Sequence, residues 1–379
     1  MIFPGATLGM LGGGQLGRYF TIAARNMGYK VMVLDADPLS PAGQLADFHL
    51  QAGYDDAAAL AQMAEQCDVA TIEFENVPAS VLERLAKSIP VYPSVSAVKV
   101  AQNRIREKTF IRKAGLQTAA FAEISALDDI QQASESVPFP AILKTSELGY
   151  DGKGQVQVAS FDQLVNAFKS TGGVPCVLEE RVNLLREISV VVGRNAAGHS
   201  QCFPVAENDH RSGILHCSIV PASCSEMTAK IARAAAMKLA DALDYVGVMA
   251  VEFFETAEHR VLVNEIAPRT HNSGHYTMDA CATSQFEQQV RMVCGLAHGS
   301  TQLLSPVAMV NLLGDVWKEG EPNWGSLFAD PDAKLHLYGK QSARPGRKMG
   351  HINLLGKRVD GLAENAESLF KLLQTPSDQ

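Results

Sequence analysis

Two short apolar runs separated by a polar turn constrain the fold of this chain more than any other feature. Residues Val248–Phe254 and Arg260–Ile266 are rich in β-branched and aromatic side chains, and the turn spans Glu255–His259. This pattern predicts a β-hairpin. Each predicted strand carries one carboxylate where an apolar side chain is expected, Glu252 on the first and Glu265 on the second.

Buried carboxylates are costly unless a cation pairs with them. Facing each other across a hairpin, Glu252 and Glu265 could share Mg²⁺, which prefers carboxylate and phosphate oxygens. Mn²⁺ is a second candidate, and Asn264 adds a neutral oxygen beside Glu265. The alternative is a surface hairpin with two solvent-facing glutamates. The loop Pro268–His275, which follows directly and is dense in donors, favours the metal site.

Composition limits the class of protein. A chain of 379 residues exceeds one comfortable core, which predicts two or three domains. The net charge of −8 argues against a non-specific nucleic-acid binder. Seven cysteines without Cys-x-x-Cys spacing predict reduced thiols. With no apolar window of membrane length and no signal-peptide pattern at Met1–Gly5, we expect a cytoplasmic enzyme without membrane or nucleic-acid partners.

The N-terminal segment has the pattern of a Rossmann-type βαβ unit. A strand over Ala6–Leu11, a glycine turn at Gly12–Gly17, a helix to Met27 and a strand over Lys30–Leu34 are expected in that order. Glycines at such a turn let backbone N–H groups approach an anion at the helix N-terminus. Asp35 either holds a dinucleotide ribose or caps the strand end, so a nicotinamide cofactor is one interpretation.

A second apolar strand, Val69–Phe74, ends among polar residues. Because ligands of parallel α/β folds lie beyond the carboxyl ends of the strands, Glu73, Glu75 and Asn76 are expected to face the same crevice as the glycine turn. The alternative for these side chains is capping of the loop.

The middle of the chain predicts a connecting helix and a flap. The basic segment Ser94–Ala114 reads as one helix, and the first domain is expected to end near residue 100. Strand 140–145 carries Lys144 and precedes the glycine-rich segment 147–155. A glycine-rich loop between two strands suits a flap over a triphosphate, although a hairpin without a ligand is the alternative. No Walker motif is present.

Three further polar clusters follow apolar runs, and each is only a weak indication of a binding site when taken alone. They are Glu179–Val182, Glu187 at the start of a long strand, and the end of residues 203–211 around His210. A carboxylate and backbone amides at such points can read an adenine edge and ribose hydroxyls.

Taken in order, these motifs resemble the ATP-grasp superfamily and, within it, most closely the 5-(carboxyamino)imidazole ribonucleotide synthetase family of purine biosynthesis. The resemblance spans nearly the whole chain, and its motifs are GGGQLGR (12–18), EFENVP (73–78), QNRIREK (102–108), ILKTSELGYDGKGQ (142–155), EERV (179–182), AENDHRSGIL (206–215), NEIAPRTHNSGHYT (264–277) and GKQSARPGRKMGHINL (339–354).

The resemblance implies an α/β fold, α+β in its ATP-grasp part, with three domains. These are a Rossmann-like domain over residues 1–103, a linker helix and lid over 104–185, and a larger ATP-grasp domain over 186–379 with a β-rich tail from about 305. Mg²⁺ would bind Glu252 and Glu265. The implied ATP-binding residues are Arg104, Lys144, Gly149, Tyr150, Asp151, Gly152, Lys153, Gly154, Gln155, Glu179, Glu180, Arg181, Val182, Glu187, His210, Asn264 and Glu265.

The resemblance also implies a second-substrate region. Residues lining the reacting centre would be Arg269, His271, Asn272, Tyr150 and Asp151. Those binding aminoimidazole ribonucleotide or bicarbonate would be Gly14, Gln15, Leu16, Glu73, Asn76, Ser273, Lys340, Arg347 and Lys348. Thr270 departs from the family pattern, which has proline there, and puts the rigidity of that loop in doubt. The family further implies a homodimer.

The implied reaction is the ATP-dependent carboxylation of aminoimidazole ribonucleotide by bicarbonate through carboxyphosphate. Three alternatives stay open from the sequence: a formate-dependent glycinamide ribonucleotide formyltransferase or another purine ATP-grasp ligase, a nicotinamide-dependent oxidoreductase, and a nucleotide-binding module without activity. The oxidoreductase leaves Lys144–Gln155 and the two glutamates Glu252 and Glu265 without a role.

Overall fold

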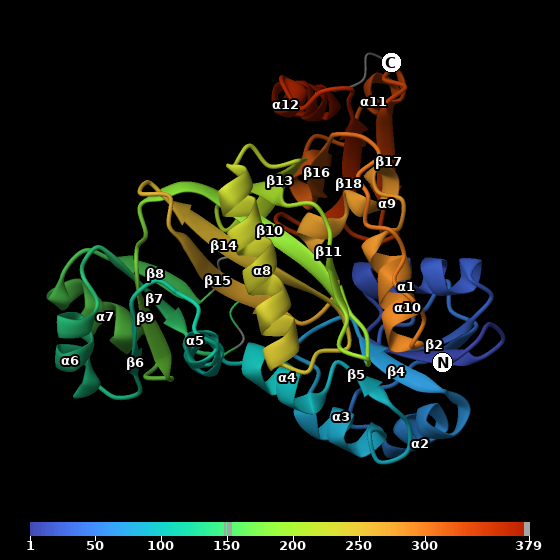
Figure 1. Cartoon of the computed structure of the whole chain (residues 1–379), viewed down its shortest axis with the longest axis horizontal. Helices are drawn as coiled ribbons and strands as arrows, with labels where there is room; N and C mark the ends of the chain where they lie inside the picture. The colour runs from blue at the N-terminus through green and yellow to red at the C-terminus, as the bar shows by residue number, and fades with distance from the viewer. Residues whose placement is uncertain (148, 150–153, 375–379) are drawn as a thin grey trace.

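The computed structural model describes residues 1–147, 149 and 154–374, which form three β-sheets with their helices (Figure 1). The first sheet is parallel, with strand order β3-β2-β1-β4-β5, and confirms the Rossmann-like unit. Its three central strands, β2, β1 and β4, are almost wholly buried, as expected when helices cover both faces of a parallel sheet. Its elements are β1 (Thr7–Leu11), α1 (Gln15–Asn26), β2 (Lys30–Leu34), β3 (Phe48–Leu50), α2 (Ala57–Gln66), β4 (Val69–Ile72), α3 (Ala79–Leu85) and β5 (Val91–Tyr92).

The connecting segment forms two helices, so the prediction of one helix over Ser94–Ala114 is wrong. Helix α4 (Val95–Ala101) ends before Asn103, whose backbone is extended, and α5 (Arg104–Lys113) begins after it. The Asn103 side chain accepts hydrogen bonds from the amides of Ile105 and Arg106. An asparagine that caps a new helix in this way interrupts the preceding one.

The second sheet is antiparallel, with order β6-β9-β7-β8, and corresponds to the predicted lid. Helices α6 and α7 bury the apolar side chains of this sheet in a separate core. The elements are β6 (Phe121–Ile124), α6 (Asp129–Ser136), β7 (Ala141–Thr145), β8 (Gln155–Val158), α7 (Phe161–Ser170) and β9 (Cys176–Glu180).

The third sheet is the largest, with order β15-β14-β10-β12-β13-β16-β18-β17 and β11 paired to β10. The tail strands β16–β18 continue this sheet, and α8 packs on the face of β10 and β14. Its elements are β10 (Leu184–Arg194), β11 (Ser200–Cys202), β12 (Ala206–Arg211), β13 (Ile214–Val220), α8 (Glu226–Ala242), β14 (Gly247–Thr256), β15 (Val261–Ala267), η1 (Asn272–Gly274), α9 (Thr277–Ala280), α10 (Gln285–Val293), β16 (Val307–Leu313), η2 (Gly314–Trp317), α11 (Trp324–Phe328), β17 (Ala333–Leu337), β18 (Lys348–Leu355) and α12 (Leu362–Leu373).

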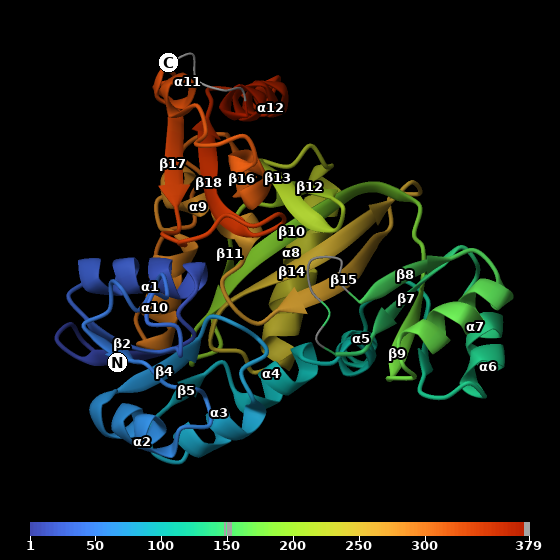
Figure 2. The same cartoon turned by 180° about the vertical axis from the view of Figure 1, so that it is seen from behind.

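The three sheets enclose one central region. Seen from either side, the lid sheet and the N-terminal sheet lie at opposite ends of the molecule, joined by α4 and α5, and the tail strands extend away from the lid (Figures 1 and 2). The first two sheets span residues 7–92 and 121–180, and the third spans 184–355. The expected domain boundary at 185/186 therefore falls inside β10, and the boundaries remain a prediction.

The predicted hairpin is confirmed as β14 and β15. These strands pair antiparallel, and Glu252 is the direct partner of Glu265. The next pair joins Phe253 to Val263, which leaves Asn264 as the extra residue of a β-bulge. Because a bulge turns consecutive side chains to one face, Asn264 and Glu265 both line the same pocket.

Two predictions from composition can be compared with the described residues. All seven cysteines are free thiols, in agreement with the expected reduced state. Among the helices that the structure describes, none has the length and apolar character needed to cross a bilayer.

Candidate active site

The three sheets meet around a pocket of about 1580 Å³. Its lining includes residues from the glycine turn, the lid, the β14–β15 hairpin and the tail. The glycine turn and the tail are more than 300 positions apart in the chain. The expected site residues that line it are Gln15, Leu16, Glu73, Asn76, Arg104, Lys144, Gly149, Gln155, Glu179, Glu180, Arg181, Val182, Glu187, His210, Glu252, Asn264, Glu265, Arg269, His271, Asn272, Lys340, Arg347 and Lys348.

The other expected residues fall into two groups. Gly14, Gly154 and Ser273 are described but do not line the pocket. Tyr150, Asp151, Gly152 and Lys153 lie outside the described residues.

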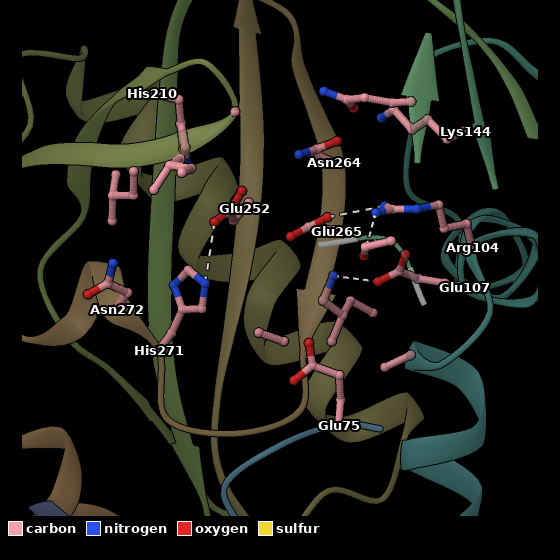
Figure 3. A pocket seen from close by; sticks show the side chains of 18 of the residues that line it. Glu75, Arg104, Glu107, Lys144, His210, Glu252, Asn264, Glu265, His271 and Asn272 are labelled. Atoms are coloured by element: carbon pink, nitrogen blue, oxygen red, sulfur yellow. Dashed lines mark hydrogen bonds and ion pairs between the residues drawn. The ribbon is translucent and has the colours of Figure 1, made fainter. Parts of the chain in front are cut away.

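Three carboxylates gather where the hairpin meets α5. Glu252 and Glu265 lie side by side on β14 and β15, and Glu107 approaches from α5 (Figure 3). Burial and the charge of Glu265 raise the pKa of Glu252 to about 7. The same two causes raise the pKa of Glu107 to about 8. The cluster therefore holds more carboxylate than it can keep ionised without a cation.

This donor set fits a magnesium ion. Glu252, Glu265 and Asn264 supply the hard oxygen ligands that Mg²⁺ prefers, and all three face the pocket. Over the ranges that the structure describes, no three His, Cys, Asp or Glu side chains have the spacing of a metal site built from protein ligands alone. Mg²⁺ commonly completes its coordination with phosphate oxygens and water, so two carboxylates are sufficient.

Cations surround the lid side of the pocket. Lys144 Nζ and Lys108 Nζ lie 3.0 and 3.2 Å from Glu179 Oε2. Burial opposes ionisation of Glu179, but the two ammonium groups outweigh it and lower its pKa to about 2. Arg104 contacts Glu265 Oε2 at 3.3 Å and donates to the carbonyl oxygen of Gly149 in the lid loop.

His210 and Glu187 form an ion pair on the opposite wall, with Nδ1 and Oε2 2.7 Å apart. Burial alone would lower the pKa of His210, but its contact with Glu187 and the charge of Glu252 raise that pKa to about 9. His210 is therefore a cation at neutral pH, placed to face an anionic ligand.

Arg269 and His271, from the loop that follows β15, also line the pocket. The guanidinium of Arg269 binds both carboxylate oxygens of Glu75, and this pairing outweighs burial and lowers the pKa of Glu75. Glu75 therefore orients and neutralises the Arg269 guanidinium and does not cap a loop.

The protonation of His271 follows from its neighbours. Burial and then Arg269 hold its pKa well below the usual range, so the ring is neutral. The Ser273 amide donates to Nδ1, and the Ser273 hydroxyl, which accepts from Ser189, lies 2.9 Å from the same nitrogen. Nδ1 is therefore an acceptor, which leaves the proton on Nε2, 3.5 Å from Glu252 Oε1.

The glycine turn already holds a carboxyl group, that of Glu73, whose pKa is raised by burial. The amides of Gly14 and Gly17 donate to it, and the amide of Gly13 donates to Asp35. A dinucleotide pyrophosphate would have to displace Glu73 from this helix N-terminus, which argues against the nicotinamide interpretation. Glu73 itself lines the pocket.

The tail closes the far end of the pocket. Lys340 Nζ donates to Gln15 Oε1 at 2.7 Å and to the carbonyl oxygen of Lys348 at 2.6 Å. Arg347 donates to the carbonyl and hydroxyl oxygens of Ser342. Gly339 and Gly346 have positive φ angles, which agrees with the expected shaped loop.

Three residues with evident roles are not among the site residues predicted from the sequence. The sequence predicts that Glu75 either faces the crevice or caps the loop, and it offers Glu107 and Lys108 only as members of the QNRIREK motif. Glu107 and Lys108 follow Arg104 by three and four positions, and this spacing places all three on one helix face. That spacing was the available signal.

Behind the site lies a buried stack of imidazoles that joins the tail to the first domain. His351 stacks on His275 and on His336, with ring centroids 4.7 and 4.5 Å apart, and Tyr19 from α1 packs against all three. Burial, then neighbouring histidines, lower the pKa of His275 to about 3 and hold that of His351 well below its usual range.

We expect this stack to make stability depend on pH. Only His275 and His351, whose pKa values are lowered, enter this argument, and above about pH 6.5 both are neutral in the folded and the unfolded state. Below it the unfolded chain binds protons and the folded chain does not, so each histidine removes about 1.4 kcal/mol of stability per pH unit until its folded-state pKa is reached. The free energy of unfolding, measured by urea denaturation, should fall less between pH 7 and pH 5.5 in His351→Gln than in the unchanged protein. Equal losses would contradict this account.

A parallel βαβ domain, an antiparallel lid and a large sheet around one acidic and cationic pocket define an ATP-grasp enzyme. Family models agree: a ribonucleotide synthetase preATP-grasp domain matches residues 5–102, an ATP-grasp domain matches 109–286, and a phosphoribosylaminoimidazole carboxylase C-terminal domain matches 307–365.

Individual relatives identify the family within the ATP-grasp enzymes. The N5-carboxyaminoimidazole ribonucleotide synthases of Brucella melitensis and Bacillus subtilis are each 44% identical to this chain, over 94% and 95% of it and 98% and 94% of their own lengths. A solved N5-carboxyaminoimidazole ribonucleotide synthetase in complex with ADP has a TM-score of 0.93 and 43% identity, covering 99% of both chains. The Aspergillus clavatus enzyme with ADP and 5-aminoimidazole ribonucleotide has a TM-score of 0.90 and 30% identity, covering 97% of this chain and 98% of its own.

The chain belongs to the N5-carboxyaminoimidazole ribonucleotide synthase family. The resemblance drawn from the sequence motifs is confirmed, as are the predicted fold class and the prediction of an ATP-grasp ligase.

Proposed function

We infer that this protein carboxylates 5-aminoimidazole ribonucleotide with bicarbonate at the expense of ATP, and so acts in purine biosynthesis. The products are N5-carboxyaminoimidazole ribonucleotide, ADP and phosphate. The observation that carries the inference is one pocket lined both by Lys144, Glu179 and His210 and by Lys340 and Arg347. We assign the first set to the nucleotide and the second set to the phosphate of the ribonucleotide. Arg269 and His271 line the same pocket and are assigned to the place where the two substrates would meet.

In the first step an oxygen of bicarbonate attacks the γ-phosphorus of ATP. The bond from that phosphorus to the β,γ-bridging oxygen breaks, giving carboxyphosphate and ADP. Catalysis of phosphoryl transfer consists mainly of positioning and of neutralising oxygen charge. We assign these two tasks to Lys144, Arg104 and protonated His210, since all three side chains line the pocket.

In the second step the exocyclic amine of the ribonucleotide attacks the carbonyl carbon of carboxyphosphate, or of CO₂ released from it. The carbon–oxygen bond to phosphate breaks, and the proton that the amine loses passes to the released phosphate. Arg269 would stabilise the departing phosphate as a charged donor. His271 offers a hydrogen bond from Nε2, because Nδ1 already accepts from Ser273.

Glu252 and Glu265, with Asn264 adjacent, would hold Mg²⁺ or Mn²⁺, which when bound neutralises phosphate oxygens as a Lewis acid. Burial and then repulsion from Glu265 raise the pKa of Glu252, and this supports the assignment. Glu187 is proposed for the ribose and Glu180–Val182 for the adenine. Gln15, Leu16, Glu73 and Asn76 are proposed for the aminoimidazole end.

Three broader expectations complete the proposal. We propose three domains with boundaries near residues 103 and 185, close to where the sheets change. We propose a homodimer, which sedimentation would test. We also propose a cytoplasmic location, which the free thiols support because such thiols persist in a reducing compartment.

The test is ADP release from Mg·ATP and bicarbonate, measured with and without 5-aminoimidazole ribonucleotide. Strong stimulation by the ribonucleotide, together with an acid-labile carbamate product, would support the proposal. Stimulation only by formate with glycinamide ribonucleotide would replace the acceptor and keep the ATP-grasp class. No ADP release under any of these conditions would favour a nucleotide-binding module without activity.

Arg347 is expected to bind the ribonucleotide phosphate. Replacing it with alanine removes a charged donor at the tail end of the pocket and leaves the lid end unchanged. We expect the KM for the ribonucleotide to rise about tenfold or more, with the KM for ATP within about twofold of normal. Initial-rate kinetics with each substrate varied in turn would measure both values. An equal rise in both would contradict the assignment.

A further inference from the structure

Helix α5 presents three charged side chains to the hairpin strand β15. Arg104, Glu107 and Lys108 share one helix face, and each contacts β15 or its side chains. Arg104 reaches the Glu265 carboxylate, whereas Glu107 and Lys108 reach backbone atoms. Figure 3 shows Glu107 directed at β15 from α5, beside Arg104.

Strand β15 is at the edge of the large sheet, where backbone groups on one side have no neighbouring strand. Side chains and a loop take the place of that strand. The amide of Ile266 donates to Glu107 Oε1 at 2.6 Å, and the carbonyl oxygen of Asn264 accepts from Lys108 Nζ at 3.3 Å. The amide of Val263 donates to the carbonyl oxygen of Gln117 at 2.8 Å.

The two contacts from Glu107 and Lys108 flank one residue, Glu265. They hold the backbone immediately before and immediately after it, at the bulge that turns Asn264 and Glu265 to the same face. A bulge loosens the ladder locally, so the direction of the Glu265 side chain depends on these outside contacts.

Lys108 also connects this strand to the lid. Its ammonium lies 3.2 Å from Glu179 on β9, and both side chains are only 2% exposed. A lysine buried to this extent requires a counterion, which Glu179 supplies. The same ammonium therefore contacts both the lid sheet, at Glu179, and the strand that bears Glu265, at the Asn264 carbonyl oxygen.

We propose that Glu107 and Lys108 are positioning residues, which hold the bulged backbone of β15 so that Glu265 presents its carboxylate to a divalent cation. This inference rests on the metal role proposed above for Glu252 and Glu265. Neither residue touches the reacting atoms in this scheme. Both act through the backbone on either side of Glu265.

The test compares two replacements of Glu107 that differ in one property. Glu107→Gln keeps an oxygen that accepts from the Ile266 amide, and Glu107→Met keeps the length but removes the acceptor. Calorimetric titration with ADP, with and without Mg²⁺, gives the factor by which Mg²⁺ tightens ADP binding. We expect Glu107→Met to reduce this factor about tenfold and to leave metal-free ADP affinity within about twofold.

Glu107→Gln should restore the factor to within about twofold of normal, since it restores the hydrogen bond. Arg106→Ala is the matched control, because Arg106 is exposed on the same helix. In kinetics, the Mg²⁺ concentration for half-maximal activity should rise about tenfold in Glu107→Met, while the KM for the ribonucleotide stays within about twofold. A general loss of structure would change both the Mg²⁺ requirement and the KM for the ribonucleotide, so a change in the Mg²⁺ requirement alone indicates a positioning role.

Each other outcome overturns the inference in a distinct way. If Mg²⁺ does not tighten ADP binding to the unchanged protein, the metal proposal fails and the positioning role with it. If Mg²⁺ does so, and Glu107→Met behaves as the unchanged protein, only the positioning role fails. Equal losses in Glu107→Met and Glu107→Gln would assign the effect to charge. Should Glu107→Met not fold, Lys108→Met carries the same expectation through Asn264, and a normal Mg²⁺ factor in it would refute the inference.

Discussion

Replacing Glu265 with glutamine should lower turnover by two to three orders of magnitude and leave the fold intact. The change is isosteric, and the Glu265 side chain is 39% exposed to the pocket, so little stability depends on it. Its carboxylate, however, is one of the two that form the proposed cation site. Loss of one preorganised electrostatic contact to a developing charge commonly costs about 10²–10³ in rate. Turnover at saturating substrates and graded Mg²⁺ would measure the effect.

The matched control is Glu258→Gln. Glu258 lies in the turn of the same hairpin and its side chain is 63% exposed, so its removal tests a charge change away from the pocket. We expect activity near normal. If Glu265→Gln reached near-normal turnover at saturating Mg²⁺, the assignment of Glu265 as a metal ligand would be wrong.

The second large effect is expected at Arg269. Arg269→Met should lower turnover at least about 100-fold, because the guanidinium is the charged donor that we assign to the departing phosphate. It should also destabilise the protein by about 2 kcal/mol, since Glu75 is left without its bidentate partner in a largely buried position. Urea denaturation and initial-rate kinetics measure the two effects separately.

The double replacement Glu75→Met with Arg269→Met distinguishes these two roles. Removing both charges should return stability to within about 1 kcal/mol of normal, because no buried charge is left unpaired. Activity should stay low, since the donor is still absent. Recovery of activity in the double variant would show that Arg269 serves only the packing of the Glu73–Asn76 loop.

Local elements were predicted well because their signals extend over only a few residues. The hairpin and the strand that carries Lys144 each follow from apolar spacing within the segment. The prediction of one helix over Ser94–Ala114 was wrong because one side-chain cap, Asn103, outweighed the average helical pattern.

The candidate site was predictable in outline, because its residues are concentrated in motifs that recur in a known family. The structure gathers most of the expected residues around one pocket. The roles of Glu107, Lys108 and Glu75 do not follow from the sequence, because they depend on partners that are distant along the chain. Glu107 meets Ile266 across 159 positions, and Arg269 meets Glu75 across 194.

The sequence by itself determined the βαβ unit, the hairpin with one carboxylate on each strand, and membership of an ATP-grasp family. Tertiary structure alone decided that Glu73 occupies the glycine turn, that Asn264 forms a bulge, and that α5 holds the edge of β15. The physical reason is the range of the forces involved. Backbone geometry and apolar periodicity act within a segment, whereas the partner of a buried charge or an unpaired backbone group is chosen only when distant segments pack together.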